Sequence, residues 1–336
     1  MPRRLAPRTD AELATAAAVA ADVWRGGGLV AFPTETVYGL GAAARDDAAV
    51  AKVFRAKGRP SDHPLIVHLA DASALERWAV DVPAVAFSLA RAFWPGPLTM
   101  VLRRNPAVPS AVTGGQATIA VRVPDHPVAL ALLRAFGDGV AAPSANRFGH
   151  LSPTRAQDVL DDLSDAPGCE ELLVVDGGPC GVGIESTIVD LTGERPLVRR
   201  PGHVGEAALA AVAGEAFAAS GEVVADADVR VPGALARHYA PRTPARRVAA
   251  GAGDRAAPDV AVLARRPAPS GHVGAWSSLP DHPIAAAAVL YASLRALDAE
   301  GVREVWVEDV PDTAAWRAVA DRLARATHAT TLEEGP

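Results

Sequence analysis

KGRPSDHPLIVH, at residues 57–68, sets two cations around a glycine and leads through two prolines into an apolar run. The glycine between Lys57 and Arg59 lets the backbone approach a ligand closely, and the prolines hold the segment extended. The apolar run predicts a buried strand over residues 65–69. Because arginine offers a planar fork and lysine a compact point charge, this cationic lip on a strand suits a polyanion such as a triphosphate. A solvated basic loop is the alternative that these residues alone leave open.

Composition also singles out Lys57. The chain carries 33 Lys and Arg residues together, but its only lysines are Lys52 and Lys57. An ammonium group in a chain that otherwise uses arginine favours a specific role for one of these two side chains.

Short buried strands and helices alternate on both sides of this stretch. Strands are predicted at residues 29–32, 98–102, 117–123, 140–143, 172–176 and 197–200, and helices at residues 10–25, 83–93, 126–136 and 153–160. This alternation indicates an α/β fold built on an open sheet.

Polar residues follow two of the predicted strands. TETVYGLG, at residues 34–41, comes directly after the strand at 29–32, where an open α/β sheet usually places its ligands. Ser144 and Asn146 follow the strand at 140–143 and share one side of an extended chain, because strand side chains repeat every two residues. Together they could hydrogen-bond phosphate or ribose oxygens. Plain turn chemistry is the alternative at both places.

Two further polar residues lie within or near strands. Arg122 in the middle of a predicted strand is either a solvated residue or an anion clamp. His68 at a strand end is either a ligand contact or a core histidine. At least four cations lie near predicted strand ends: Lys57, Arg59, Arg122 and Arg200.

The length of 336 residues suits two domains. We predict a catalytic domain over residues 1–213, an extended linker over residues 214–243 that lies over the active site, and a small α/β domain over residues 244–336. Proline and glycine in the linker make it partly stiff and able to lie across a groove.

Composition argues against several classes of protein. The chain is 49% hydrophobic and 21% charged with a net charge of −6, so it has no bulk basic field for nucleic acid. No run of about 18 uncharged apolar residues predicts a membrane helix, and the N-terminus lacks the apolar core of an export signal. We therefore expect a cytoplasmic protein. Cys169 and Cys180 are expected to be reduced, incidental thiols, and no metal ligands are assigned to protein side chains.

The chemistry that fits these residues is transfer at a phosphorus centre. We find no nucleophile, base and orienting residue that could form a triad, and no dense set of carboxylates for two metals. Positioning and charge neutralisation would carry such a transfer, with Mg²⁺ entering on the nucleotide.

Seven segments in one order resemble the YrdC-type threonylcarbamoyl-AMP synthases. They are PTETVYGL at 33–40, KGRP at 57–60, PLIVH at 64–68, WPGPLT at 94–99, AVRVP at 120–124, PSAN at 143–146 and ESTIVD at 185–190. PG at 232–233, HYAP at 238–241 and LYASLR at 290–295 resemble the long, two-domain branch of that family. The resemblance covers residues 10–328. It implies a twisted open mixed sheet in the catalytic domain and a smaller, Rossmann-like α/β domain after the linker.

The resemblance also implies a reaction. L-threonine and bicarbonate form a carbamate, whose oxygen attacks the α-phosphate of ATP to give threonylcarbamoyl-AMP and pyrophosphate, with Mg²⁺ accompanying ATP. The product serves threonylcarbamoyladenosine modification of tRNA beside the anticodon, through a downstream tRNA-modifying enzyme that takes the adenylate. Direct tRNA binding is not required.

Residue roles are carried over from the family by motif. The catalytic set around the nucleotide phosphates is Lys57, Arg59, Ser144 and Asn146. The residues expected to hold threonine are Thr34, His68, Arg122 and Thr187, with Arg122 as the partner of its carboxylate. The residues expected to complete the ATP side are His63, Arg200, His238 and Tyr239.

The linker departs from the family pattern. The family usually reads Ser-Pro-Gly-Met before its His-Tyr pair, whereas Val231, Ala234 and Leu235 stand near those places here. The effect of these changes on closure of the linker is left open. Two other functions also stay open: a related carbamoyl-adenylate enzyme with a different acceptor or pathway, and an RNA-binding module.

Overall fold

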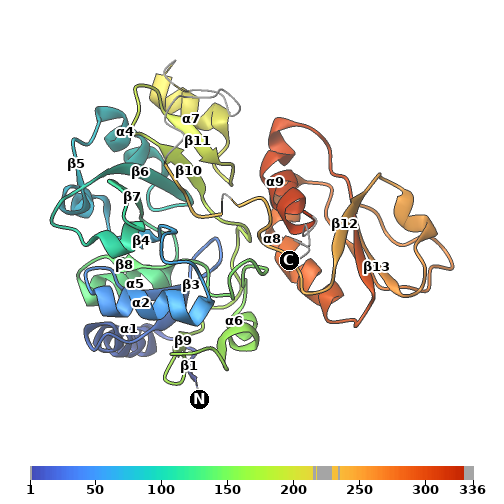
Figure 1. Cartoon of the computed structure of the whole chain (residues 1–336), viewed down its shortest axis with the longest axis horizontal. Coiled ribbons are helices and arrows are strands. Elements are labelled where there is room, and N and C mark those ends of the chain that lie inside the picture. The colour runs from blue at the N-terminus through green and yellow to red at the C-terminus, as the bar shows by residue number, and fades with distance from the viewer. Residues whose placement is uncertain (1, 215–216, 218–228, 234, 329–336) are drawn as a thin grey trace, which may run out of the picture. The chain divides into compact units, whose positions relative to one another are not determined.

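The computed structural model describes residues 2–214, 217, 229–233 and 235–328. The chain forms two compact units, one of Met1–Phe148 with Pro153–Ala234 and one of Gly149–Ser152 with Leu235–Pro336. Each unit has its own sheet (Figure 1). The predicted linker, residues 214–243, contains the point at which the chain passes between the units.

The first unit is built on an 11-stranded mixed sheet with the order β1-β9-β2-β3-β8-β4-β7-β6-β10-β11, and β5 pairs with β6. The strands are β1 (Arg3–Leu5), β2 (Val30–Pro33), β3 (Tyr38–Ala43), β4 (Ile66–His68), β5 (Ala79–Val80), β6 (Leu98–Arg104), β7 (Thr118–Arg122), β8 (Val140–Ala141), β9 (Leu173–Val175), β10 (Thr187–Asp190) and β11 (Leu197–Arg200). β4 is parallel to β7 and β6 to β10, whereas β7 and β6 are antiparallel. The predicted open mixed sheet is therefore confirmed.

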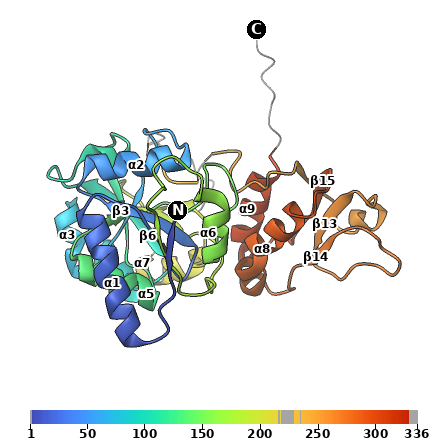
Figure 2. The ribbon, with the colours of Figure 1, turned by 90° about the horizontal axis from the view of Figure 1, so that it is seen from below.

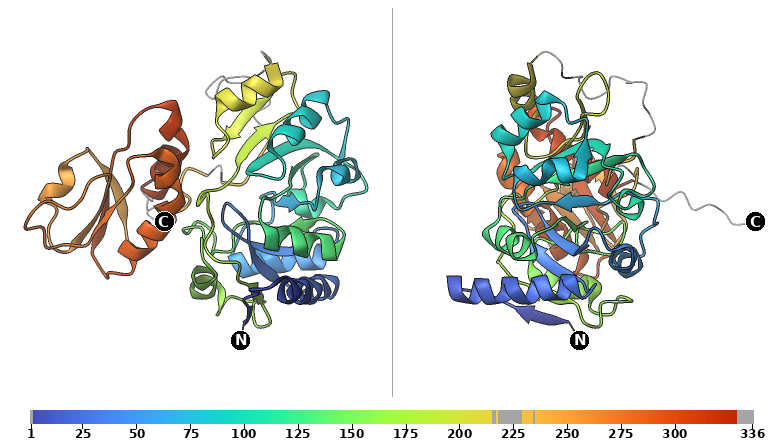
Figure 3. Two further views of the ribbon diagram at one scale, coloured as in Figure 1. Left: turned by 180° about the vertical axis from the view of Figure 1, so that it is seen from behind. Right: turned by 90° about the vertical axis from the view of Figure 1, so that its left-hand side faces the viewer.

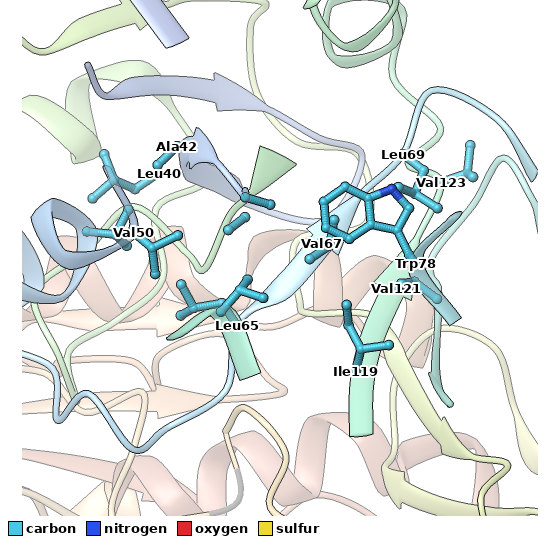
Figure 4. Packing of buried hydrophobic residues seen from close by; sticks show 14 of the residues in the cluster. Leu40, Ala42, Val50, Leu65, Val67, Leu69, Trp78, Ile119, Val121 and Val123 are labelled. Atoms are coloured by element: carbon cyan, nitrogen blue, oxygen red, sulfur yellow. The ribbon is translucent and has the colours of Figure 1, made fainter. Parts of the chain in front are cut away.

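One face of this sheet, which we call the helix face, is covered by helices. These are α2 (Asp47–Lys57), α3 (Leu75–Trp78), α4 (Ala84–Phe93), α6 (Ala156–Leu163) and α7 (Glu206–Ala213). Their apolar side chains pack on alternate strand residues such as Leu40, Val67 and Val121, with Trp78 closing the cluster (Figure 4). Burial of this apolar surface is the main source of stability for the unit.

The opposite face is covered in two parts. α1 (Asp10–Arg25) and α5 (Pro127–Phe136) lie side by side over β2, β8 and β9 (Figures 2 and 3). Over β4, β7, β6 and β10 the cover is instead the linker, whose Val231 packs against Ile66, Val101, Ala120 and Ile188. We call this second part the linker face.

Local sequence explains the helix that leads to the cationic lip. Asp46 caps α2, its carboxylate accepting from the backbone N–H groups of Ala48 and Ala49, as its position predicts. Gly58 ends the helix in the left-handed region at φ 63°, where glycine carries no steric penalty. α2 therefore stops with Lys57 as its last residue.

β3 was not predicted, because YGLGAA lacks the branched side chains typical of strands. A Cβ on Gly41 would lie 2.8 Å from Phe32 and from Val140 and 3.1 Å from Trp24. Glycine is needed there because aromatic rings occupy the space above the strand. β1, β12 and α7 were also absent from the sequence predictions.

The second unit holds a four-stranded parallel sheet with the order β12-β15-β13-β14. Its strands are β12 (Ala245–Val248), β13 (Val260–Ala264), β14 (Trp276–Ser278) and β15 (Glu304–Glu308), and its helices are α8 (Pro283–Asp298) and α9 (Arg317–Ala326). α8 packs on β13 and β14, and α9 contacts α8 and β12 (Figure 2). The predicted small α/β domain is confirmed.

Candidate active site

Strand alternation places a set of polar side chains on the linker face. Side chains two residues apart point the same way, so His68 follows Ile66 and Arg122 follows Ala120 on that face. By the same alternation, the side chain of Thr99 points to the same face as that of Val101, and the side chain of Ser186 to the same face as that of Ile188. His68, Arg122 and Thr99 lie on three neighbouring strands and Ser186 directly precedes a fourth, β10, and all four side chains are buried. The sequence therefore concentrates polar groups on the part of the sheet that Val231 of the linker covers.

Arg122 is the centre of one end of this face. Its Nε donates to the Gly96 carbonyl at 3.2 Å, Nη1 donates to Thr36 Oγ1 at 2.9 Å, and Nη2 lies 2.6 Å from Glu35 Oε1. Thr34 Oγ1 lies 2.8 Å from Thr36 Oγ1. The structure thus links Thr34 to Arg122 through Thr36.

His68 lies beside Arg122 in the β4–β7 register. Burial, followed by the positive charge of Arg122, lowers the pKa of His68 to about 3. The imidazole is therefore neutral near pH 7 and can donate or accept a hydrogen bond without adding charge. Its Nδ1 is buried and makes no hydrogen bond to any residue that the structure describes.

Lys57 marks the other end. Its Nζ donates to the carbonyl oxygens of Ser144 and Asn146, both at 2.5 Å, and the side chain is buried. Burial, followed by the charge of Arg59, lowers the pKa of Lys57 to about 7. A buried group whose pKa is perturbed in this way is a candidate for a functional site, because such shifts cluster at sites of binding and catalysis.

Arg59 and His63 gather around Phe148. The Arg59 guanidinium lies 5.5 Å from the Phe148 ring centroid, and Nη2 donates to the Pro64 carbonyl at 2.9 Å. The His63 ring meets the same phenyl ring edge to face at 5.5 Å. Burial and Arg59 lower the pKa of His63. Sequence reasoning did not predict a role for Phe148, because its partners are brought together only by the fold.

Thr187 is placed differently from the sequence expectation. Its hydroxyl donates to the Val204 carbonyl at 2.8 Å and accepts from the Val204 N–H at 3.1 Å. Val204 belongs to the helix-face core, so the hydroxyl of Thr187 points away from Arg122. Ser186, which was not predicted, takes the place on the linker face. The two neighbours could be told apart only once the face of β10 was known.

The structural role of Thr187 predicts a loss of stability. Thr187→Val keeps the shape but leaves the buried Val204 groups without their partner, so we expect a loss of about 1–3 kcal/mol in the free energy of unfolding. Urea unfolding measures this loss. Thr15→Val is the matched control, because Thr15 lies on the surface of α1; equal losses in the two variants would contradict the role.

Arg200 holds the linker to the sheet. Its Nε and Nη2 donate to the Ser186 carbonyl at 3.1 and 3.0 Å, and Nη1 donates to the Pro232 carbonyl at 3.1 Å. Arg230 adds an ion pair with Asp62 at 3.0 Å. The structure thus places Arg200 beside Ser186 and the linker.

The substituted linker residues have different positions. Val231 is buried against the linker face, so the apolar side chain gives the linker a hydrophobic contact with the sheet. Leu235 is 38% exposed, and its carbonyl accepts from Arg325 Nη1 at 2.5 Å. Ala234 lies outside the described residues.

His238 and Tyr239 belong to the second unit. His238 is buried and its Nδ1 accepts from the Tyr239 N–H at 3.0 Å. The Tyr239 ring lies 5.9 Å from that of Tyr291, with the Arg322 guanidinium 5.3 Å from its centroid. Tyr239 adopts φ 58°, which is unusual for a residue with a side chain. Their role in binding ATP stays a prediction.

Within residues 2–214, 217, 229–233 and 235–328, no three His, Cys, Asp or Glu side chains gather as metal ligands. Cys169 and Cys180 are buried, free thiols, and burial raises the pKa of Cys169 to about 11. None of the helices in these ranges is long and apolar enough to cross a membrane.

Known proteins resemble this chain over nearly its whole length. A family model described as Telomere recombination, for the Sua5, YciO and YrdC proteins, matches residues 22–202, and one described as Threonylcarbamoyl-AMP synthase, C-terminal domain, matches residues 204–328. Threonylcarbamoyl-AMP synthase from Pyrococcus abyssi is 40% identical over 92% of this chain and 93% of its own length. The Bacillus subtilis enzyme of the same name is 46% identical over 68% of this chain and 65% of its own length.

A solved structure extends this similarity to three dimensions. The crystal structure of P. abyssi Sua5 complexed with L-threonine matches with a TM-score of 0.84 and 36% identity, covering 97% of both chains.

Proposed function

The chain belongs to the threonylcarbamoyl-AMP synthase family in its long, two-domain form, and from this membership we propose that it joins L-threonine, bicarbonate and ATP into L-threonylcarbamoyl-AMP. The carbamate oxygen of carboxylated threonine attacks the α-phosphorus of ATP. The bond from that phosphorus to the oxygen bridging to the β-phosphate breaks, and pyrophosphate leaves. The enzyme is thus a nucleotidyltransferase.

One observation carries this proposal: two different sets of polar groups lie at opposite ends of β4. Lys57 contacts the carbonyls of Ser144 and Asn146, which follow β8, and β8 runs antiparallel to β4 toward its beginning. Arg59 donates to the Pro64 carbonyl just before β4, and His68 with Arg122 stands at the end of β4. Four residues of extended chain span about 13 Å, at roughly 3.3 Å per residue. That distance suits a ligand with an amino acid at one end and a nucleotide phosphate near the other.

The Arg122 end supports binding of threonine. Its guanidinium would receive the carboxylate, because arginine forms strong charge-assisted hydrogen bonds with carboxylates. Neutral His68 with its buried Nδ1, the Thr34 hydroxyl and Ser186 supply hydrogen-bond partners for the remaining polar atoms. The Thr187 hydroxyl is not included, because Val204 occupies it.

The Lys57 end supports binding of the triphosphate. Lys57 and Arg59 would offset the charge that builds on the departing pyrophosphate, with the Ser144 hydroxyl and the Asn146 amide as hydrogen-bond donors. His63 lies beside Arg59 through Phe148 and would border the same ligand. Mg²⁺ enters bound to ATP and supplies further charge neutralisation there.

The pKa of Lys57 predicts a pH dependence. Because that pKa is about 7 in the free enzyme, the ammonium form, which attracts triphosphate, predominates below pH 7 and is lost above it. We expect kcat/KM for ATP, which reports the free enzyme, to fall as the pH rises through about 7. Lys57→Met should lack this decline, measured at saturating threonine and bicarbonate. A decline of equal size in the variant would assign it to another group.

We also propose that the linker, residues 214–243, lies over the active site between the catalytic domain, residues 1–213, and the small domain, residues 244–336. The contacts of Val231, Arg200 and Arg230 with the linker face support this arrangement. His238 and Tyr239, at the end of the linker, would complete the ATP site.

In the cell, the product is proposed to serve threonylcarbamoyladenosine formation in tRNA. The adenylate is a mixed anhydride of a carbamate and a phosphate, so a second enzyme must accept its threonylcarbamoyl group in the cytoplasm. The net charge of −6 gives this chain no bulk field for tRNA, which agrees with transfer through that partner enzyme.

Pyrophosphate release tests the proposed reaction. The purified protein is incubated with ATP and Mg²⁺, and threonine and bicarbonate are each omitted in turn. Loss of pyrophosphate in both omissions is expected, and release indifferent to both would end the proposal. Serine in place of threonine tests the acceptor; equal rates with serine would favour the related enzyme with a different acceptor.

A further inference from the structure

Glu35 is a buried carboxylate that the reaction described above does not use. Its Oε1 lies 2.6 Å from Arg122 Nη2, and its side chain is 12% exposed. Its other oxygen, Oε2, is buried and accepts no hydrogen bond from any residue that the structure describes. A buried carboxylate oxygen without a hydrogen bond is costly, so its presence calls for an explanation.

The backbone holds Glu35 in this place. The Val182 N–H donates to the Glu35 carbonyl at 2.7 Å, and the neighbouring Thr34 hydroxyl donates to the Val37 carbonyl at 2.7 Å. Glu35 is therefore fixed from both sides, by the glycine-rich loop at residues 177–183, which contains Val182, and by its own turn. These backbone hydrogen bonds hold the segment that places the Glu35 carboxylate against Arg122.

The ion pair presents two opposite charges at one point of the linker face. Arg122 also donates to Gly96 and Thr36, so its guanidinium is oriented independently of Glu35. A zwitterionic amino acid carries a carboxylate and an ammonium two bonds apart. An arginine and a carboxylate in direct contact match both groups, the arginine receiving the carboxylate and the free Oε2 the ammonium.

We propose that Glu35 is a catalytic residue that binds the threonine ammonium and takes a proton from it as the carbamate forms. This role rests on the function proposed above. As the nitrogen bonds to the carbon of bicarbonate, the C–OH bond breaks, and the nitrogen loses two protons. One proton joins the departing hydroxyl to make water, and the other goes to the Glu35 carboxylate. The carbamate then attacks ATP, a step in which Glu35 has no part.

Among the residues that the structure describes, Arg122, His126 and Cys180 interact with this carboxylate. Arg122 on β7 is the positive partner, His126 at the start of α5 feels the charge of Glu35, and the Cys180 thiol of the glycine-rich loop does also. Burial lowers the pKa of His126 and raises that of Cys180, so both are neutral near pH 7. Of these groups, Glu35 is the one in direct contact with Arg122, where the threonine carboxylate would be held, so its Oε2 is the atom placed to receive the ammonium proton.

Glu35→Gln separates the two steps. Its amide oxygen can still accept from Arg122, so the site is kept while the base is lost. We expect threonine-dependent pyrophosphate release at pH 7 to fall about 10²–10⁴-fold, the usual contribution of a general base. The reverse adenylyl transfer, in which threonylcarbamoyl-AMP and pyrophosphate give ATP, should stay within a few-fold of the unchanged enzyme because it needs no proton from an ammonium.

The pH profile adds a readout that a purely structural role would not produce. Without its base, Glu35→Gln should work only on threonine that arrives as the neutral amine. Its rate should therefore rise about tenfold per pH unit below the pKa of the threonine amine. Glu35→Asp, which keeps a carboxylate, should restore part of the rate at pH 7. Glu76→Gln, at an exposed position on α3, is the matched control and should behave as the unchanged enzyme.

The outcomes separate two failures. Suppose that the unchanged enzyme forms ATP from threonylcarbamoyl-AMP and that Glu35→Gln runs the forward and the reverse reaction at normal rates. Only the role proposed for Glu35 would then be overturned. Equal loss of both directions in the variant would also overturn this role, because Glu35 would then support the site as a whole. If the unchanged enzyme itself forms no ATP from threonylcarbamoyl-AMP and pyrophosphate, the proposed function fails with it.

Discussion

Lys57→Met is expected to lower turnover about 10²–10³-fold, which is the usual cost of removing one donor that stabilises charge in a transition state. The ammonium of Lys57 would lie against the phosphate from which pyrophosphate departs. Methionine has a similar length and no charge, so the loss would report the ammonium rather than the packing of α2. The measurement is the steady-state rate of pyrophosphate release at saturating threonine, bicarbonate and ATP.

The same variant should stay folded. Lys57 is buried and its pKa is lowered to about 7 by burial, so the folded protein holds this cation at a cost that methionine does not carry. The Ser144 and Asn146 carbonyls lose a donor in the variant, which offsets part of this gain, so we expect the change in melting temperature to be small beside the loss of turnover. Lys52→Met is the matched control, because Lys52 lies on the same helix and donates to the Gly27 carbonyl at 2.6 Å. Near-normal turnover in Lys57→Met would show that Lys57 is not part of the active site.

Arg122→Lys is expected to raise the KM for threonine and lower kcat/KM about 10²–10³-fold. The guanidinium already meets Gly96, Thr36 and Glu35 and would have to receive the threonine carboxylate as well. A single ammonium cannot reproduce these directions, because lysine is a point charge and arginine a planar fork. Breaking a buried charged contact of this kind typically costs about 2–5 kcal/mol.

Arg199→Lys is the control for this change. Arg199 forms an ion pair with Asp190 at 2.8 Å on a neighbouring strand, so its replacement changes a similar buried contact outside the site. It should alter stability while leaving the KM for threonine unchanged. A KM for threonine that is equally unaffected by Arg122→Lys would show that the carboxylate is bound elsewhere.

Much of the fold follows from local sequence. Asp46 and Gly58 are residue types that cap helices, so both ends of α2 follow from the sequence. The apolar alternation around Arg122 predicts a strand. β3 did not follow, because its glycines make sense only against Phe32 and Trp24, which lie elsewhere in the chain. β12 was missed because it is an edge strand whose two arginines are exposed.

The site was predictable in part for the same reason. Motifs located Lys57, Ser144, His68 and Arg122, and the structure brings these residues to two ends of one strand. Which of two adjacent hydroxyls faces a ligand depends on the side of the strand that meets the core. For that reason Ser186 and the ion-pair partner of Arg122 emerged only from the folded chain.

Threonylcarbamoyl-AMP itself is the most direct test of the account. The protein is incubated with ATP, Mg²⁺, L-threonine and ¹³C-labelled bicarbonate. The nucleotide products are then separated, and their masses are determined by mass spectrometry. We predict a product with the mass of threonylcarbamoyl-AMP that carries the label and depends on threonine. An enzyme that releases pyrophosphate under these conditions but yields only unlabelled AMP would contradict the proposed reaction.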